Sequence, residues 1–212
     1  MKRILTLLLV LAALAGLCAC QAGAPAPELD GGTWTEVADR TFRPSDYAAD
    51  WTVRVIPENW VLPADLPLGG DTRTEVREDL LLHGLRQGSL LPGFTVYRYK
   101  GEGKLETAYT LSEGVAPAWQ PFFNGDGTRL AFPWMPSAQA EAWSLRVADL
   151  ASGTTRDLTL PEGAGERDFL LCAWQEDGSL LVTSVNMGYD FDEDPPVTWV
   201  YTFPGQEEPS TE

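Results

Sequence analysis

Residues 118–134 read AWQPFFNGDGTRLAFPW, and residues 173–184 read AWQEDGSLLVTS. Both stretches begin with Ala-Trp-Gln, lead to an Asp-Gly pair and continue into a run of residues that favours a β-strand. The two tryptophans lie 55 residues apart and the two Asp-Gly pairs 51 residues apart. An Asp-Gly pair between two such runs is typical of a β-hairpin, because glycine readily adopts the positive φ that a tight turn requires. The sequence therefore predicts a repeated hairpin unit of about 50 residues.

Further hairpins flank the first motif. One is predicted over residues 94–111, with its turn at residues 101–103, and another over residues 144–160, with its turn at residues 151–153. A unit with four short strands is what one blade of a β-propeller requires. The pattern predicts three such units, over residues 78–111, 115–160 and 169–203.

The third unit ends at Pro204 without an outer strand. Residues 51–56 (WTVRVI) alternate in polarity and are predicted to pair with that unit and close the ring. The predicted fold class is therefore all-β, a small or incomplete β-propeller of about three to four four-stranded blades. The alternative is an irregular antiparallel β-meander with one short helix, because Thr72 and Glu75 fit a capping box for a helix over residues 71–82.

The repeated motifs resemble the TolB-type β-propeller repeat, which typically reads Pro-x-Trp-Ser-Pro-Asp-Gly-x-x-Ile-Ala-Phe. Residues 117–132 match this pattern around an insertion at residues 122–125. The second motif matches without an insertion, but Glu176 replaces the proline and Val182 the usual small residue. The resemblance covers residues 94–203 and implies a fold rather than an activity, because such blades occur in binding scaffolds and beside catalytic domains.

The N-terminus resembles that of a bacterial lipoprotein precursor. Lys2 and Arg3 precede an apolar run over residues 4–17, which is shorter than the roughly 20 residues that a membrane-spanning helix needs. The run ends in LCAC, which matches a lipobox with Cys20 as the residue that receives the lipid; Cys18 follows the bulky Leu17 and fits less well. The resemblance implies a protein outside the cytoplasm, lipid-anchored to the bacterial membrane at the cell surface or in the periplasm. An ordinary signal peptide cleaved nearby is the alternative.

Composition predicts the remaining boundaries. Residues 1–19 are the predicted signal peptide, and residues 20–32 are Cys20 followed by the Pro-rich and Gly-rich stretch QAGAPAPELDGG, predicted to be a flexible tether. Residues 33–204 are the predicted propeller-like domain, and residues 205–212 (GQEEPSTE) are predicted to be an acidic disordered tail.

The chain is strongly acidic. It has 15 Lys and Arg against 31 Asp and Glu, a net charge of −16 that becomes −18 once Lys2 and Arg3 are removed. Such a charge repels polyanions, so we expect no nucleic acid partner, while cationic proteins and divalent cations stay possible. The alternative is that the negative charge only keeps an exported protein soluble and has no role in binding.

Residues able to perform catalysis are few. His83 is the single histidine, so one protomer contains neither a His-based zinc cluster nor a pair of catalytic imidazoles, and we expect His83 to be a satisfied or exposed structural residue. The sequence contains no nucleophile elbow, zincin motif or phosphate loop. We therefore predict no catalytic residue, no metal site, no cofactor and no enzymatic activity. Cys172 lies in an apolar run and is predicted to be a buried free thiol.

Two further features invite a binding hypothesis. Asp190, Asp192 and Asp194 alternate like the first ligands of a calcium loop, but Pro195 stands where a glycine should turn the chain. A solvated acidic loop is therefore favoured over a cation site. The repeated tryptophans suggest carbohydrate stacking, but their equivalent places in the repeat favour packing between units.

Three functions remain compatible with these features. The leading one is a membrane-anchored, non-catalytic binding or interaction module that presents its blades to an envelope protein or a cell-wall ligand. The second is a hydrolase, or an accessory domain of a hydrolase that acts on a cell-envelope glycan or peptide. The third is an extracytoplasmic ligand-sensing module coupled to a membrane partner.

Overall fold

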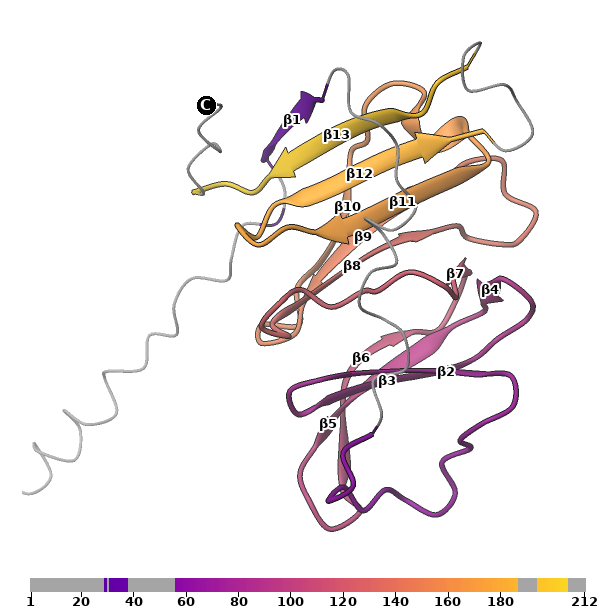
Figure 1. Ribbon diagram of the computed structural model, residues 1–212, viewed down its shortest axis with the longest axis vertical. Coiled ribbons are helices and arrows are strands. Elements are labelled where there is room, and N and C mark those ends of the chain that lie inside the picture. The colour runs from indigo at the N-terminus through magenta and orange to yellow at the C-terminus, as the bar shows by residue number, and fades with distance from the viewer. Residues whose placement is uncertain (1–28, 30, 38–55, 187–193, 206–212) are drawn as a thin grey trace, which may run out of the picture.

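The computed structural model describes residues 29, 31–37, 56–186 and 194–205. These residues form thirteen strands and one short 3-10 helix, η1 (Ala164–Glu166), and they contain no α-helix (Figure 1). No helix in this part of the chain has the length and the apolar character to cross a membrane. The fold is therefore all-β, and its antiparallel sheets are open.

Sheet I has the strand order β2-β3-β5-β6 and comprises β2 (Thr72–Arg77), β3 (Leu80–Leu85), β5 (Phe94–Tyr99) and β6 (Leu105–Leu111). The alternative of a helix over residues 71–82 is wrong, because this segment forms β2 and the start of β3. Strand alternation buries Leu80 and Leu82 together in the core. The carboxylate of Glu75, which a capping box would direct to its own helix, accepts hydrogen bonds from the distant backbone N–H groups of Phe122 and Phe123 instead.

Sheet II has three strands in the order β10-β9-β8, comprising β8 (Arg129–Trp134), β9 (Ser144–Asp149) and β10 (Thr155–Leu158). The prediction of a fourth strand beginning at Val115 is only partly met. Val115 exchanges two backbone hydrogen bonds with Met135, and then β7 (Ala116–Pro117) pairs with β4 (Leu90–Leu91). Proline lacks the N–H group that a ladder needs, and Pro117 and Pro121 bound the part of the segment that does not pair with β8. Pairing resumes after Pro121, where the carbonyl of Phe122 accepts from the N–H group of Ala131.

Sheet III has the order β1-β13-β12-β11, comprising β1 (Thr33–Glu36), β11 (Phe169–Trp174), β12 (Leu180–Val185) and β13 (Val197–Thr202). Its outer strand comes from the N-terminal side, but the prediction that residues 51–56 supply it is wrong. Strand β13 lies between β12 and β1, with Glu36 paired to Trp199, so both of its edges are occupied. Trp34 holds β1 in place because its ring lies 4.8 Å from that of Tyr201 and its Nε1 donates to the carbonyl of Thr159. Residues 51–55 lie outside the described residues.

The packed body begins earlier in the chain than composition indicates. Leu29, within the stretch predicted to be a tether, is buried in the core beside Tyr201. The hydroxyl of Tyr201 donates to the carbonyl of Leu29 and accepts from the N–H group of Gly32. This part of the predicted tether is therefore packed against sheet III.

The two predicted Asp-Gly turns have the same local structure, which confirms the repeated hairpin. In the first, Asp126 Oδ1 accepts from the backbone N and the hydroxyl of Thr128, at 2.9 and 2.6 Å. In the second, Asp177 Oδ1 accepts from the same two groups of Ser179, at 2.9 and 2.6 Å. The glycines have φ values of 71° and 82°, in the left-handed region that glycine adopts without strain.

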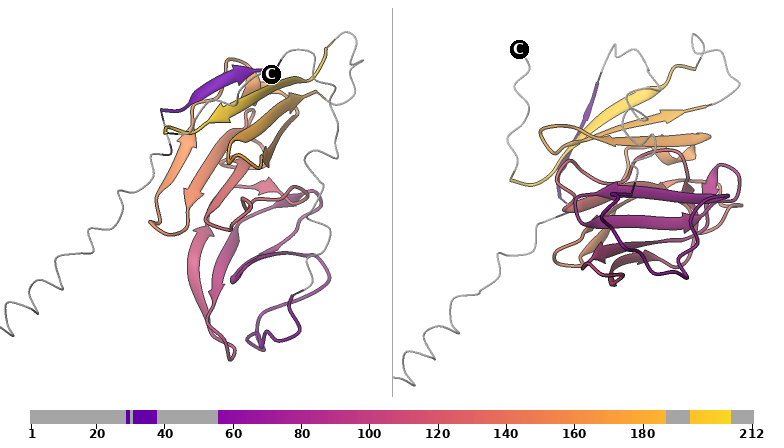
Figure 2. Two further views of the ribbon diagram at one scale, coloured as in Figure 1. Left: turned by 60° about the vertical axis from the view of Figure 1, so that its left-hand side comes forward. Right: turned by 60° about the horizontal axis from the view of Figure 1, so that its bottom comes forward.

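The sheets stack on one another, with sheet II between the other two (Figures 1 and 2). In β8, Leu130 and Phe132 pack into the core shared with sheet I, whereas Ala131 packs into the core shared with sheet III. Because both faces of this strand are covered, four consecutive residues of β8 are buried. The two stacking interfaces are the two main hydrophobic cores of the protein.

A buried polar network connects sheets I and III through the segment that precedes sheet II. On β2, Arg73 pairs with Glu75 at 2.7 Å and donates to the backbone carbonyls of Pro117 and Gln120. The side-chain oxygen of Gln120 accepts from the backbone N of Cys172 on β11 at 2.8 Å. The guanidinium of Arg73 also lies 3.9 Å above the ring of Phe122. Both ions and Gln120 are buried.

The variant Arg73→Met tests this network. We expect it to lower the free energy of unfolding by about 3–5 kcal/mol, because the Glu75 carboxylate would stay buried without its cation. Arg98→Met is the matched control, since Arg98 pairs with Asp79 at 3.6 Å on the exposed surface, and it should cost less than about 1 kcal/mol. Chemical denaturation measures both, and equal costs would contradict a linking role for Arg73.

Candidate functional site

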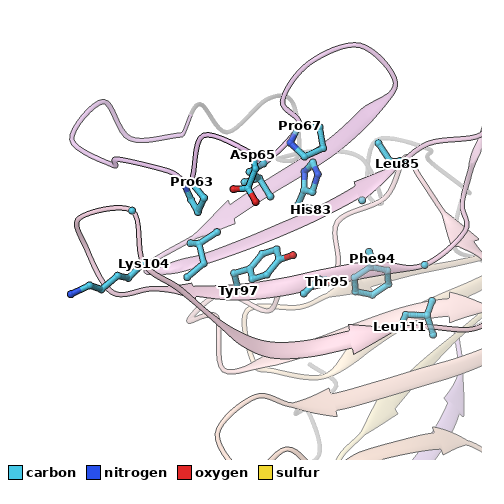
Figure 3. A pocket seen from close by; sticks show the side chains of 15 residues that line it. Pro63, Asp65, Pro67, His83, Leu85, Phe94, Thr95, Tyr97, Lys104 and Leu111 are labelled. Carbon is cyan, nitrogen blue, oxygen red and sulfur yellow. The ribbon is translucent and has the colours of Figure 1, made fainter.

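A groove of about 790 Å³ runs along the face of sheet I that points away from sheet II (Figure 3). Its floor is built by β3, β5 and β6, and its roof by residues 61–69, which we call the strap. Side chains from the roof and from the floor line it together. They include Pro63, Asp65, Leu66, Pro67, His83 and Tyr97.

Strand register explains why polar and apolar groups meet in this groove. On β3, Leu81, His83 and Leu85 share the face opposite to the buried Leu80 and Leu82. His83 lies opposite Thr74 of β2 and Thr95 of β5. Tyr97 lies opposite Leu81. The floor therefore combines an imidazole, a phenol and a hydroxyl with aliphatic groups.

The strap is attached to sheet I near its two ends. At the first end, the N–H group of Val61 donates to the hydroxyl of Tyr99 at 2.9 Å, and the ring of Trp60 stacks on that of Tyr99 at 4.3 Å. At the second end, Thr72 Oγ1 accepts from the N–H group of Gly69 and donates to its carbonyl. Between the ends, Leu66 N donates to the carbonyl of Pro63, which is a bond within the strap.

His83 is the most buried titratable group in the groove. Only 7% of its surface is exposed, and its Nδ1 has no hydrogen-bond partner among the described residues. Its Nδ1 is thus neither satisfied nor exposed, and leaving a buried polar atom unpaired costs about 1–3 kcal/mol. Burial lowers the pKa of His83 from its ordinary value of 6.5, so the imidazole is neutral at neutral pH.

The strap and the groove carry exposed apolar side chains and two opposite charges. Val61, Leu68 and Leu85 are the exposed large hydrophobic residues of the described part of the chain, at 62, 50 and 58%. Val61 and Leu68 lie on the strap, and Leu85 lines the groove. Asp65 and Lys104 are exposed lining residues of opposite charge. Such a site offers apolar contact and a few hydrogen bonds, which suits binding.

The acidic motif near the C-terminus is described only at its last carboxylate. Asp194 pairs with Arg167 at 3.0 Å and accepts a hydrogen bond from Asn186 Nδ2 at 2.7 Å. Both of its oxygens are therefore occupied by protein groups. Asp190 and Asp192 lie outside the described residues, as does Cys20. The residues that are described contain no cluster of three metal-ligating side chains.

The prediction that the repeated tryptophans pack between units holds for Trp174, which packs into the core between sheets II and III. It is wrong for Trp119, which packs on the opposite face of sheet III beside Leu171 and Ala173. Trp119, which precedes β8, packs against Phe169 of β11, with ring centroids 6.4 Å apart. Trp174 stacks on Phe203 at 5.7 Å, and its Nε1 donates to the carbonyl of Phe122. The insertion after Trp119 explains the difference, because it shifts the first indole away from the turn that follows it.

Cys172 is a buried free thiol, which confirms the prediction for this residue. Burial raises the pKa of the thiol. Its Sγ donates to the carbonyl of Ala131 of sheet II at 3.5 Å. The uncharged form of this side chain is therefore part of the core between sheets II and III.

Comparisons of the chain with protein-family models, with curated proteins and with solved structures return no match.

His83 predicts how stability depends on pH. Because the pKa of His83 in the folded state lies below 6.5, the unfolded chain binds the proton first as the pH falls. The contribution of the neutral imidazole to the free energy of unfolding is therefore complete above pH 6.5, and it is lost as the pH drops towards the folded-state pKa. We expect wild type to lose more free energy of unfolding between pH 7.5 and 5.5 than His83→Gln, by no more than about 1.4 kcal/mol per pH unit. Urea denaturation at constant ionic strength measures this, and parallel losses would contradict it.

Proposed function

We propose that this chain is an extracytoplasmic lipoprotein that acts as a non-catalytic binding module for an envelope protein. In this proposal, the lipid on Cys20 attaches the domain to the membrane and the groove on sheet I receives the partner. The lipobox supports the anchor, and the groove supports the binding role. The groove is the single observation that carries the function.

The finer fold proposal is that the three sheets are blades of a small, incomplete β-propeller. The matching Asp-Gly turns of sheets II and III support it, as does the stacking of successive sheets face to face. The polar network gives further support, because it joins β2 and β11, each of which is an edge strand of its sheet. In a propeller, β2, the segment that contains Gln120 and β11 would be the inner strands of three successive blades.

The composition of the groove favours a protein partner. Leu85, 58% exposed, lines the groove together with the buried His83, and the exposed Val61 and Leu68 lie on the strap. Exposed apolar side chains close to a few polar groups are typical of protein interaction sites. The overall charge of −16 disfavours polyanionic ligands and favours a neutral or basic partner. Lining groups that offer hydrogen bonds, such as Tyr97 and Thr95, would fix the orientation of the bound segment.

The anchor can be tested by metabolic labelling with a fatty acid. We expect Cys20→Ala to abolish incorporation of labelled palmitate and to release the domain from membranes. Cys18→Ala is the matched control and should retain both the label and the membrane fraction, because the lipobox places the acceptor at position 20. Equal labelling of wild type and Cys20→Ala would contradict the anchor.

The binding surface can be tested by site-specific cross-linking. A photoreactive benzoylphenylalanine at position 85, on the rim of the groove, should give an adduct with an envelope protein in cells. The same group at position 151, in the exposed turn after β9, should not. The partner, identified by mass spectrometry and purified, should bind the Leu85→Asp variant at least tenfold more weakly than wild type. Ala151→Asp should bind like wild type, and identical adducts at both positions would contradict a specific groove.

A further inference from the structure

The strap covers the groove without being bonded along its length. Among the described residues, no hydrogen bond joins residues 62–68 to sheet I, so the attachment rests on Tyr99 at one end and Thr72 at the other. Gly69 and Gly70 lie at the second end, with φ values of 91° and 64° and no atom near the place of a Cβ. The middle of the strap can therefore move while both ends stay attached.

His83 lies beneath this unbonded middle. In Figure 3, Pro67 and Asp65 of the strap are adjacent to the imidazole on one side, and Tyr97 and Thr95 of β5 lie on the other. The unpaired Nδ1 is tolerated because the neutral ring can leave one nitrogen as an unused acceptor. A protonated ring needs acceptors for two N–H groups, and a buried cation needs water or a counter-charge.

The charged and titratable groups around His83 are few. From the strap, Asp65 is the carboxylate that lines the groove; from β5, Tyr97 contributes a phenol; from β2, the residue opposite is the uncharged Thr74. Lys104, on the hairpin between β5 and β6, is a further cation in the lining. Asp65 is exposed and offsets a buried positive charge only weakly, so hydration is the main way to accommodate the proton.

We infer that the strap is a pH-sensitive cover, and that a proton on His83 lifts its middle and opens the groove to the partner. The inference rests on the proposed function for its biological meaning, because it concerns access to the same groove. Its physical basis is independent of any partner. The added proton leaves both ring nitrogens as donors, and Nδ1 is buried without an acceptor, so protonation favours a strap position that lets water reach this nitrogen. Burial lowers the pKa of His83 when the strap is in place, so the proton binds more tightly to an open form in which the ring is hydrated.

The single histidine allows a direct test in the intact mature chain. The imidazole proton of His83 is unique in an NMR spectrum, so its titration midpoint can be measured without assignment ambiguity, and we expect it below 6.5. Leu66 lines the groove, and the turn closed by its bond to Pro63 loses its packing against sheet I when the strap lifts. Hydrogen exchange at the amide of Leu66, corrected for the intrinsic pH dependence, therefore reports on the strap. We expect protection of Leu66 to fall at least threefold between pH 7.5 and 5.0 in wild type and to stay constant in His83→Gln.

Two controls separate strap opening from other events. The amide of Leu181, in β12 of sheet III, should keep its protection at both pH values, which shows that the change is local. Tyr99→Phe removes the acceptor for Val61 N and should loosen the strap at both pH values.

Several outcomes would overturn the inference. A midpoint at or above 6.5, an equal loss of protection at Leu66 and Leu181, or the same pH response in His83→Gln would each do so. If His83→Gln does not fold, the titration and the comparison of Leu66 with Leu181 in wild type still decide the matter. None of these measurements involves the partner, so a failed cross-linking experiment would reject the proposed function while leaving the pH-sensitive strap standing.

Discussion

The arrangement of the three sheets depends on the buried ion pair between Arg73 and Glu75. The pair satisfies backbone groups of residues 117–123, where pairing with β8 is interrupted: Arg73 donates to the carbonyls of Pro117 and Gln120, and Glu75 accepts from the N–H groups of Phe122 and Phe123. Burying two charges is unfavourable unless every hydrogen bond is made, so the geometry of this segment is narrowly constrained. Through Gln120 the same constraint reaches β11, and with it sheet III.

The stacking of the three sheets also determines where the groove forms. Sheet II has its two faces covered by the other sheets, whereas sheet I has one face against sheet II and the other against the strap. A loop covers a sheet less completely than another sheet does, since it lacks a continuous apolar face. The result is a groove in which a largely buried imidazole, exposed aliphatic groups and an unbonded roof occur together. Binding and its regulation are proposed for this face because the fold leaves it incompletely packed.

The sequence predicts local features of this protein well. The Asp-Gly turns, the hairpins around them and the buried Cys172 depend on neighbouring residues, and glycine, β-branched residues and alternating polarity are visible in any sequence. Predictions about pairing at a distance were less accurate. Residues 51–56 and residues 33–36 are both short alternating segments, and Trp34 packing on Tyr201 decided between them. Thr72 and Glu75 fit a helix cap locally, but pairing with β3 makes them part of a strand, and the carboxylate of Glu75 is bound by backbone groups more than 40 positions away.

The sequence by itself determined an all-β chain with a repeated turn and a strongly acidic charge, and it predicts a lipid anchor at Cys20. Only the tertiary structure decided that His83 is buried without a partner, because this depends on residues 61–69 crossing the face of β3. A lone histidine in the run LLLHGL has no local signal that separates an exposed ring from a covered one. The physical reason is that turns and strand polarity are set by interactions between neighbours in the chain. Burial and groove formation are set by packing between segments that the sequence places far apart.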